Sequence, residues 1–199
     1  STAVIILGIG VILIFVASPK YAQFALMGIA GACFMGIFLA LESYRLERLA
    51  IWRNPEKYEK GYQTLQGLYA IGSGGVFGVG IGNSVQKLGF VPEAQNDMIF
   101  SIICEELGLA GAGIIVFLFL LLIWRFFLIA SGSRDLFGAL IATGAMAHMM
   151  IQVILNIAVV TNTIPNTGIT LPFISYGGTS VMFLLIEMGL VLSVSQVVD

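Results

Sequence analysis

Residues 98–129 read MIFSIICEELGLAGAGIIVFLFLLLIWRFFLI and form the longest of the apolar segments in the chain. As an α-helix this segment would be about 48 Å long. A bilayer core is about 30 Å thick, and about 20 apolar residues in a helix cross it. The segment therefore predicts a transmembrane helix that tilts or protrudes from the membrane.

Segments of this kind recur along the whole chain, which is 58% hydrophobic and only 10% charged. The others are residues 3–17, 21–41, 62–85, 136–160 and 176–197. Their apolar residues are continuous, whereas the strands of an outer-membrane barrel alternate apolar and polar residues. We therefore expect an all-α fold, a polytopic membrane helix bundle in which residues 1–199 form a single transmembrane domain with about six transmembrane helices. Because Ser1 leads directly into an apolar segment, we also expect a fragment that lacks its true N-terminus.

The basic residues predict which loops face the cytoplasm, because Lys and Arg are enriched on that side. Residues 45–61 carry Arg45, Arg48, Arg53, Lys57 and Lys60, and Arg125 and Arg134 flank the turn after the longest segment. Only Lys20 and Lys87 fall in the intervening loops. We therefore expect a cytoplasmic interfacial loop at 45–61, cytoplasmic chain ends, and external loops at 18–20, 86–97 and 161–175.

Residues 45–54 mix apolar and basic side chains and precede Pro55. This pattern is typical of a short amphipathic helix at a membrane interface, which a proline would end. An ordinary basic loop that only sets the topology fits equally well.

An acidic and amide-rich cluster separates two apolar segments. It consists of Glu93, Gln95, Asn96, Asp97, Glu105 and Glu106. Ionisable groups near a membrane usually face a polar cavity and mark function. We expect Asp97 to be the central residue, although an aspartate there also suits the N-cap of the helix that follows. Glu105 and Glu106 are adjacent and lie about 12–13 Å further along a helix, so one can face the cavity while the other pairs at a helix interface.

Residues 69–84, YAIGSGGVFGVGIGNS, are rich in glycine, which is costly inside a helix. Gly74, Gly78 and Gly82 are four residues apart, a spacing that permits close helix packing. Alternatively, the helix breaks here and lines a cavity. The segment contains neither GxxxxGK nor GxGxxG, so the phosphate-loop motifs are excluded.

Residues 161–180, TNTIPNTGITLPFISYGGTS, form a second polar stretch, which proline and glycine make rigid and sharply turned. Its hydroxyl and N–H groups can bind a sugar or a phosphate. The other interpretation is a loop that only orients the last helix.

Polar residues also occur inside the later segments. His148, Gln152 and Asn156 share one helix face, so this face is expected to contact protein or a cavity. For His148 we favour a hydrogen bond between helices over a proton relay, and for Glu187 a partner within the bundle. Cys33 and Cys104 both lie in apolar segments and are expected to be buried free thiols.

Four motifs occur in the order typical of one membrane family. They are YRLERLAIWRNP (44–55), GYQTLQGLYAIGSGGVFGVGIGNSVQKL (61–88), VPEAQNDMIFSIICEELGLAG (91–111) and IPNTGITLPFISYGGTS (164–180). With these motifs the chain resembles the FtsW/RodA/SpoVE family of shape, elongation, division and sporulation (SEDS) proteins, and its FtsW/SpoVE branch more than RodA. The resemblance implies a ten-helix fold, of which this chain would hold the last six helices.

The chain departs from the family pattern around the acidic position. Gln95 replaces histidine, Asn96 replaces threonine and Met98 replaces phenylalanine, whereas Asp97 is kept. The lysine that often follows Pro-Thr in division members is absent from residues 165–168, which is closer to the sporulation pattern.

The resemblance implies a peptidoglycan glycosyltransferase that polymerises lipid II at the outer face of the bacterial cytoplasmic membrane. Asp97 would then be the general base that activates a sugar hydroxyl. Substrate-binding roles are expected for Lys87, Glu93, Gln95, Asn96, Glu105, Glu106, Pro165, Ser175, Tyr176, Gly177, Gly178 and Ser180. Lys87 fits a contact to the diphosphate or an interfacial anchor.

The charge of the diphosphate also suggests that a divalent cation, Mg²⁺ or Mn²⁺, with unknown ligands, basic residues of the missing N-terminal helices, or both complete the site. The separation of Asp97 from the two glutamates argues against a metal site shared between them. Expected partners are lipid II, the membrane, a class B penicillin-binding transpeptidase and other division or sporulation proteins; nothing suggests nucleic acid. The isolated fragment is expected to be inactive. A lipid II flippase and a non-catalytic scaffold remain alternatives.

Overall fold

The structure is a computed structural model that describes residues 2–17, 28, 31 and 43–196. All regular elements among these residues are helical, which confirms the predicted all-α class. The predicted span 21–41 lies outside the described residues, except for Gly28 and Gly31.

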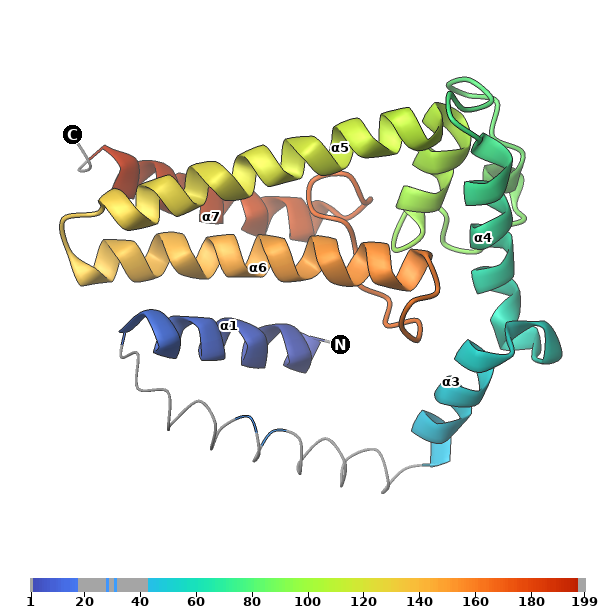
Figure 1. Cartoon of the computed structure of the whole chain (residues 1–199), viewed down its shortest axis with the longest axis horizontal. Coiled ribbons are helices and arrows are strands. Elements are labelled where there is room, and N and C mark those ends of the chain that lie inside the picture. Colours follow the sequence, from blue (N-terminus) through green and yellow to red (C-terminus); the bar gives the residue numbers. More distant parts are fainter. Residues whose placement is uncertain (1, 18–27, 29–30, 32–42, 197–199) are drawn as a thin grey trace.

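Among the described residues, the helices of the bundle run lengthwise (Figure 1). They are α1 (Thr2–Ala17), α5 (Ile99–Gly132), α6 (Leu136–Val160) and α7 (Gly178–Ser195). Within the described part of the chain, α5, α6 and α7 are long and apolar enough to cross a membrane, as the apolar segments predict. α6 contacts the other three, and its buried Ala142, Ala145 and Ala147 allow them to approach closely.

A polar pair joins α6 to α7 inside the bundle. His148 Nδ1 lies 2.8 Å from Glu187 Oε1 and 3.0 Å from Glu187 Oε2. Ionisable side chains within a span are costly unless they are paired. The expected helix-packing contact of His148 and the expected bundle partner of Glu187 are therefore the same interaction.

The prediction of a span at residues 62–85 is wrong. The helical part, α4 (Tyr62–Gly74), is about 20 Å long, which is too short to cross a core of about 30 Å. Figure 1 shows α4 running across one end of the bundle rather than along it. The remaining residues form a glycine-rich loop, which is uncharged and rich in apolar residues although its backbone is not helical.

The long helix α5 breaks at Gly108, where φ is 67° and ψ is −170°. Residues 109–132 would be about 36 Å long, enough to cross the membrane core. Residues 99–107 turn away from this direction beside α4 (Figure 1). The longest apolar segment therefore bends at Gly108 instead of protruding straight from the membrane.

The glycine-rich loop pairs with the broken turn of α5 through its backbone. The N–H groups of Val79 and Gly80 donate to the carbonyls of Glu105 and Glu106, both at 3.0 Å. In return, the N–H groups of Leu109 and Ala110 donate to the carbonyls of Gly75 and Val76, at 2.9 and 3.0 Å. These bonds replace the helical bonds that are lost at the break.

Side chains would not fit this contact. A Cβ at Gly74 would overlap the carbonyl of Cys104, and a Cβ at Gly108 would overlap the loop backbone. Gly108 also adopts a positive φ, which glycine tolerates best. Close packing is thus confirmed for Gly74 and Gly78, with α5 as the neighbour, but not for Gly82, which has no atom within 4 Å of an added Cβ. The helix also ends at Gly74, as the second interpretation expects.

The remaining elements are short and lie at the same end of the bundle. They are α3 (Ser43–Arg53), η1 (Pro55–Lys57), η2 (Glu59–Gly61) and η3 (Gln86–Leu88). α3 is the helix predicted at 45–54, and it stops just before Pro55.

The contact between α4 and α5 predicts opposite effects for two neighbouring glycines. Gly74→Ala should destabilise the protein by about 1–3 kcal/mol, because the backbone of α5 must move. Gly72→Ala meets no atom within 4 Å, so it should be neutral or stabilise by up to about 1 kcal/mol through helix propensity. Thermal unfolding in detergent measures both. Equal destabilisation by the two variants would contradict the close backbone contact.

Candidate functional site

Asp97 lies at the end of the loop that leads into α5 and is 8% exposed. The N-cap of α5 is Met98, and no side chain caps the helix, so the N-cap interpretation of Asp97 is wrong. Its Oδ1 instead accepts a hydrogen bond from Gln63 Nε2 of α4, at 3.4 Å. Asp97 is therefore held at the meeting point of α4 and α5.

The surroundings of Asp97 raise the pKa of its carboxyl group. Burial is the largest cause, because it disfavours the charged form. The negative charge of Glu93 raises the pKa further, whereas the nearby backbone N–H groups of Asp97 and Met98 lower it. A raised pKa makes the carboxylate a stronger base than an exposed aspartate.

Asn156 fixes the backbone on both sides of this site. Its side chain is fully buried near the end of α6. Its Nδ2 donates to the carbonyls of Asp97, at 2.8 Å, and Ile169, at 2.7 Å. One amide on a membrane helix thus orients the Asp97 loop and the Pro/Gly loop, which agrees with the prediction that this face of α6 contacts protein.

The Pro/Gly loop also docks directly on the Asp97 loop. Ser175 Oγ donates to the carbonyl of Asn96, at 2.6 Å, and accepts from the N–H of Leu171, at 2.7 Å. The N–H of Tyr176 donates to the carbonyl of Gln95, at 2.8 Å. The two loops therefore lie on one face, as predicted, and Ser175 is occupied in joining them.

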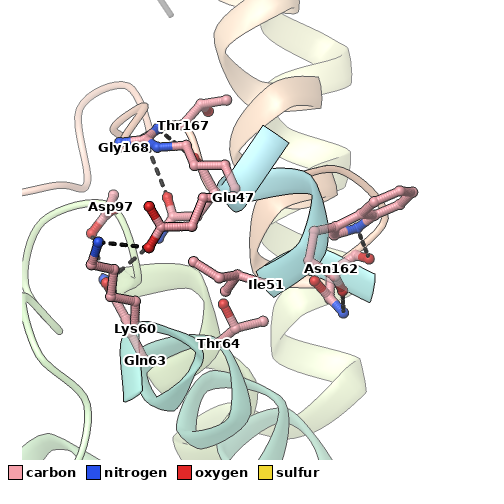
Figure 2. Close-up of a pocket in the computed structure, with 12 residues that line it drawn as sticks. Glu47, Ile51, Lys60, Gln63, Thr64, Asp97, Asn162, Thr167 and Gly168 are labelled. Atoms are coloured by element: carbon pink, nitrogen blue, oxygen red, sulfur yellow. Dashed lines mark hydrogen bonds and ion pairs between the residues drawn. The ribbon is translucent and has the colours of Figure 1, made fainter. Parts of the chain in front are cut away.

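A cavity of about 440 Å³ opens beside Asp97 (Figure 2). It is lined from α3, η2, α4 and the two loops by Glu47, Arg48, Ile51, Trp52, Lys60, Gln63, Thr64, Asp97, Asn162, Asn166, Thr167 and Gly168. Arg48 Nη1 donates to the carbonyl of Asn166, at 3.0 Å, and Trp52 Nε1 donates to the carbonyl of Asn162, at 2.9 Å. Lys60 Nζ lies 2.9 Å from Glu47 Oε1. The cavity thus combines a buried carboxyl group with two cations.

A second cavity of about 320 Å³ also borders Asp97. It is lined by Glu93, Asn96, Asp97, Gly168, Thr170 and Tyr176. It contains hydroxyl, amide and aromatic groups but no cation among the described residues that line it. Asp97 and Gly168 border both cavities, so one carboxyl group faces two differently charged spaces.

The contacts of α3 overturn the predicted topology. Residues 45–61 were expected on the opposite side of the membrane from 86–97 and 161–175, but Arg48 and Trp52 bind the last of these loops directly. The reason is that 62–85 is not a span, so the chain does not change sides between α3 and Asp97. The count of basic residues therefore no longer assigns Asp97 to the outside.

Three predicted substrate-binding residues, Lys87, Glu105 and Glu106, line neither cavity. Their side chains instead hold the loop at 84–87. Glu105 Oε1 accepts from the N–H of Val85, at 3.1 Å, and the other oxygen accepts from Ser84 Oγ. Glu106 Oε1 accepts from the N–H of Ser84, at 3.4 Å, and pairs with Lys87 Nζ at 2.6 Å. Both glutamates therefore hold one loop, although adjacency on a straight helix suggested that they point apart.

Of the other predicted residues, Pro165, Gly177, Gly178 and Ser180 line neither cavity. Gln95 lines a more distant cavity with Lys87 and contributes only its carbonyl near the site. Among the described residues no three His, Cys, Asp or Glu side chains form a group that could hold a metal ion.

Sequence reasoning missed Arg48, Lys60, Gln63 and Asn166. The amphipathic pattern at 45–54 marked Arg48 as interfacial, but the wrong topology removed it from the site.

The motifs around this site are those of a known family, and comparison with known proteins agrees. The profile of the cell cycle proteins FtsW, RodA and SpoVE matches residues 1–199. The chain belongs to the FtsW/RodA/SpoVE family. Stage V sporulation protein E of Bacillus subtilis (strain 168) is 44% identical over 98% of this chain and 54% of its own length. A probable peptidoglycan glycosyltransferase FtsW of Coxiella burnetii is 42% identical over 92% of this chain and 50% of its own length.

Solved structures show the same fold for this FtsW/RodA/SpoVE chain. One is described as "Structural coordination of polymerization and crosslinking by a peptidoglycan synthase complex"; it matches with a TM-score of 0.75 and 26% identity over 98% of this chain and 55% of that chain. An aspartate-to-alanine mutant of the rod shape determining protein RodA from Thermus thermophilus matches with a TM-score of 0.51 and 34% identity over 65% of this chain and 39% of that chain. The chain spans about half the length of the curated relatives it matches.

The corrected topology predicts which loops of this family member share a side of the membrane. Single cysteines replacing the exposed Arg53 and Glu93 should react with a membrane-impermeant maleimide from one side, and a cysteine replacing Arg134 only from the other. The background would have Cys33 and Cys104 replaced by alanine. If the cysteines at positions 53 and 93 are labelled in intact cells, Asp97 lies on the outer side of the membrane. Opposite sides for 53 and 93 would contradict the structure.

Proposed function

We propose that this protein is a peptidoglycan glycosyltransferase that polymerises lipid II into glycan strands at the outer face of the cytoplasmic membrane. The observation that carries the proposal is the position of Asp97, a buried carboxyl group between a cationic cavity and a neutral to acidic one. Transfer of a sugar from a diphosphate needs a base between the two reacting molecules, and this arrangement supplies it. Relatives named as probable peptidoglycan glycosyltransferases support the assignment.

In the proposed reaction the 4-hydroxyl of an acceptor sugar attacks the anomeric carbon of the donor. The new bond joins the acceptor oxygen to that carbon, and the bond from the carbon to the diphosphate oxygen breaks. Asp97 takes the hydroxyl proton, and undecaprenyl diphosphate leaves with the electron pair. One in-line displacement inverts the anomeric centre, so an α-linked donor gives a β-linked product.

The donor diphosphate fits the larger cavity. Developing negative charge on a leaving group is stabilised by positioned cations and N–H donors. Arg48 and Lys60 supply these charges, and the amide groups of Gln63, Asn162 and Asn166 surround them. Arg48 is oriented by its bond to the carbonyl of Asn166. This assignment replaces the expected role of Lys87, whose charge is paired with Glu106.

The acceptor sugar fits the smaller cavity. Tyr176 is 73% exposed there and offers an aromatic face and a hydroxyl to a sugar ring. Asn96 and Thr170 add hydrogen-bonding groups. The absence of a cation among the described residues that line this cavity suits an uncharged sugar better than a diphosphate. Asp97 borders both spaces and can therefore reach the attacking hydroxyl.

A divalent cation fits the donor side of the site as part of the substrate complex. Mg²⁺ is commonly held by one or two carboxylates together with phosphate oxygens. Asp97 and Glu47 are the carboxylates that line this cavity. When bound, such a cation would neutralise charge on the diphosphate.

The proposed partner is a transpeptidase of the class B penicillin-binding type, which would crosslink the new strands. The similar solved structure is described as a peptidoglycan synthase complex that coordinates polymerisation with crosslinking. Other division or sporulation proteins are proposed to determine where the protein acts.

Asp97→Asn should lower glycan polymerisation from lipid II by about 10²–10⁴-fold, the usual contribution of a general base. The wild-type rate should fall as the pH drops through the raised pKa of Asp97, because only the carboxylate accepts a proton. This acidic limb should therefore lie above the pH expected for an exposed aspartate. The assay uses purified full-length protein with its partner and gel separation of glycan strands.

Unchanged thermal stability of Asp97→Asn would show that the loss is chemical. Equal product from wild type and variant would remove Asp97 from the mechanism. No product from either, with lipid II transport intact, would favour a flippase, and neither activity would favour a scaffold.

Removal of the two cations should weaken use of the diphosphate substrate. Arg48→Ala and Lys60→Ala should each lower kcat/KM for lipid II by about 10- to 100-fold, the effect of losing a charged hydrogen bond. Arg53→Ala, on α3 like Arg48, and Lys57→Ala, on η1 next to the η2 element that carries Lys60, are matched controls, because both residues lie outside the cavity. Similar losses in all four variants would point to a general attraction to anionic lipid and contradict the donor site.

A further inference from the structure

The glycine-rich loop after α4 presents large apolar side chains outward. Phe77 is 84% exposed and Ile81 is 81% exposed. Val76, which directly precedes Phe77, is also exposed. No charged residue occurs between Lys60 and Lys87. Apolar side chains concentrated in this way on an uncharged loop mark a surface that meets something apolar.

The backbone of this loop is suited to a medium without water. An irregular backbone within a membrane must have its N–H and C=O groups satisfied by protein. Here Val79 and Gly80 donate to α5, and the carbonyls of Gly75 and Val76 accept from it. These four polar groups thus face α5, while the side chains of Phe77 and Ile81 are exposed.

The loop is also continuous with a surface that faces lipid. It pairs with α5 at Gly108, the point from which residues 109–132 run through the bundle. Leu109 follows directly and is 71% exposed, and the exposed residues beyond it include Ile114 and Phe117. This face belongs to a helix long and apolar enough to cross a membrane, and only 17% of an apolar 18-residue stretch of that helix is buried inside the protein.

The adjoining helix α4 has the pattern of an interfacial helix. Gly67, Ala70 and Gly74 are its buried residues. Tyr62 and Tyr69 are exposed and seven residues apart, so they share the outer face. Tyrosine is enriched at the boundary between lipid and water. Because α4 runs across the end of the bundle (Figure 1), this face can lie along the membrane surface.

We propose that residues 76–81 insert into the acyl chains of the membrane leaflet next to Asp97. Phe77 and Ile81 form the inserted tip, and α4 lies at the level of the headgroups. Because Gln63 of α4 contacts Asp97, insertion fixes the depth of the site relative to the leaflet. The ligand is the fatty acyl region of the bilayer itself, and the proposal does not depend on the chemistry at Asp97.

Fluorescence quenching in nanodiscs tests this contact. The full-length protein carries Phe77→Trp, and lipids brominated near the headgroup end of the acyl chain act as quenchers. The signal is the difference from the parent protein, which retains Trp52 and Trp124. Phe117→Trp, on the exposed face of α5, is the lipid control. Tyr58→Trp, in the charged stretch between α3 and α4, is the water control.

The expected result is a loss of fluorescence for Phe77→Trp comparable to that of Phe117→Trp, with no loss for Tyr58→Trp. Iodide in the aqueous phase should quench only Tyr58→Trp. Quenching of Phe77→Trp by iodide and not by bromine would overturn the proposal, because the loop would lie in water. Protection from both quenchers would also overturn it, since protein would then cover the loop. Ile81→Trp provides an independent reading if Phe77→Trp does not fold.

Discussion

The backbone pairing between residues 75–80 and 105–110 is the contact on which the arrangement of the site depends. A helix that breaks at Gly108 leaves carbonyl groups before the break and N–H groups after it without helical partners. In or near lipid each unsatisfied group would cost several kcal/mol. The glycine-rich loop satisfies both sets, and it can do so only because Gly74 and Gly108 carry no side chain at the contact. The bend in turn directs residues 99–107 across the end of the bundle and brings Asp97 to Gln63.

The site itself is built on loops, but membrane helices hold those loops. Asn156 lies in α6, and its amide binds the carbonyls of Asp97 and Ile169. Ser175 then joins the Pro/Gly loop to Asn96. These bonds are buried, where an unpaired carbonyl is costly, so the two loops have little freedom to separate. In the proposed reaction the Asp97 carboxyl group has to reach substrates on two sides, and this rigidity would support that role, because catalysis depends on a fixed geometry.

The sequence predicts the long helices well, and it fails where hydropathy and topology interact. Residues 136–160 coincide with α6 because a continuous apolar stretch of that length has few alternatives. Residues 62–85 are also uncharged and rich in apolar residues, yet they form a short helix and a glycine loop. This one error placed α3 on the wrong side, and Arg48 and Lys60 were lost from the expected site with it. The roles expected for Glu105 and Glu106 assumed a straight helix and a free cavity, whereas both carboxylates bind the loop at 84–87.

Lys60 and Lys87 differ in how available their charges are. Lys87 lies 2.6 Å from Glu106, and the two side chains are 33% and 16% exposed. Lys60 lies 2.9 Å from Glu47, and these side chains are 70% and 45% exposed. An exposed ion pair contributes little because water screens it, so a diphosphate can replace Glu47 beside Lys60 at small cost. Replacing Glu106 would also free the N–H of Ser84 and loosen the loop that covers α5. Lys87 therefore stabilises the loop at 84–87, whereas Lys60 is available to the proposed diphosphate ligand.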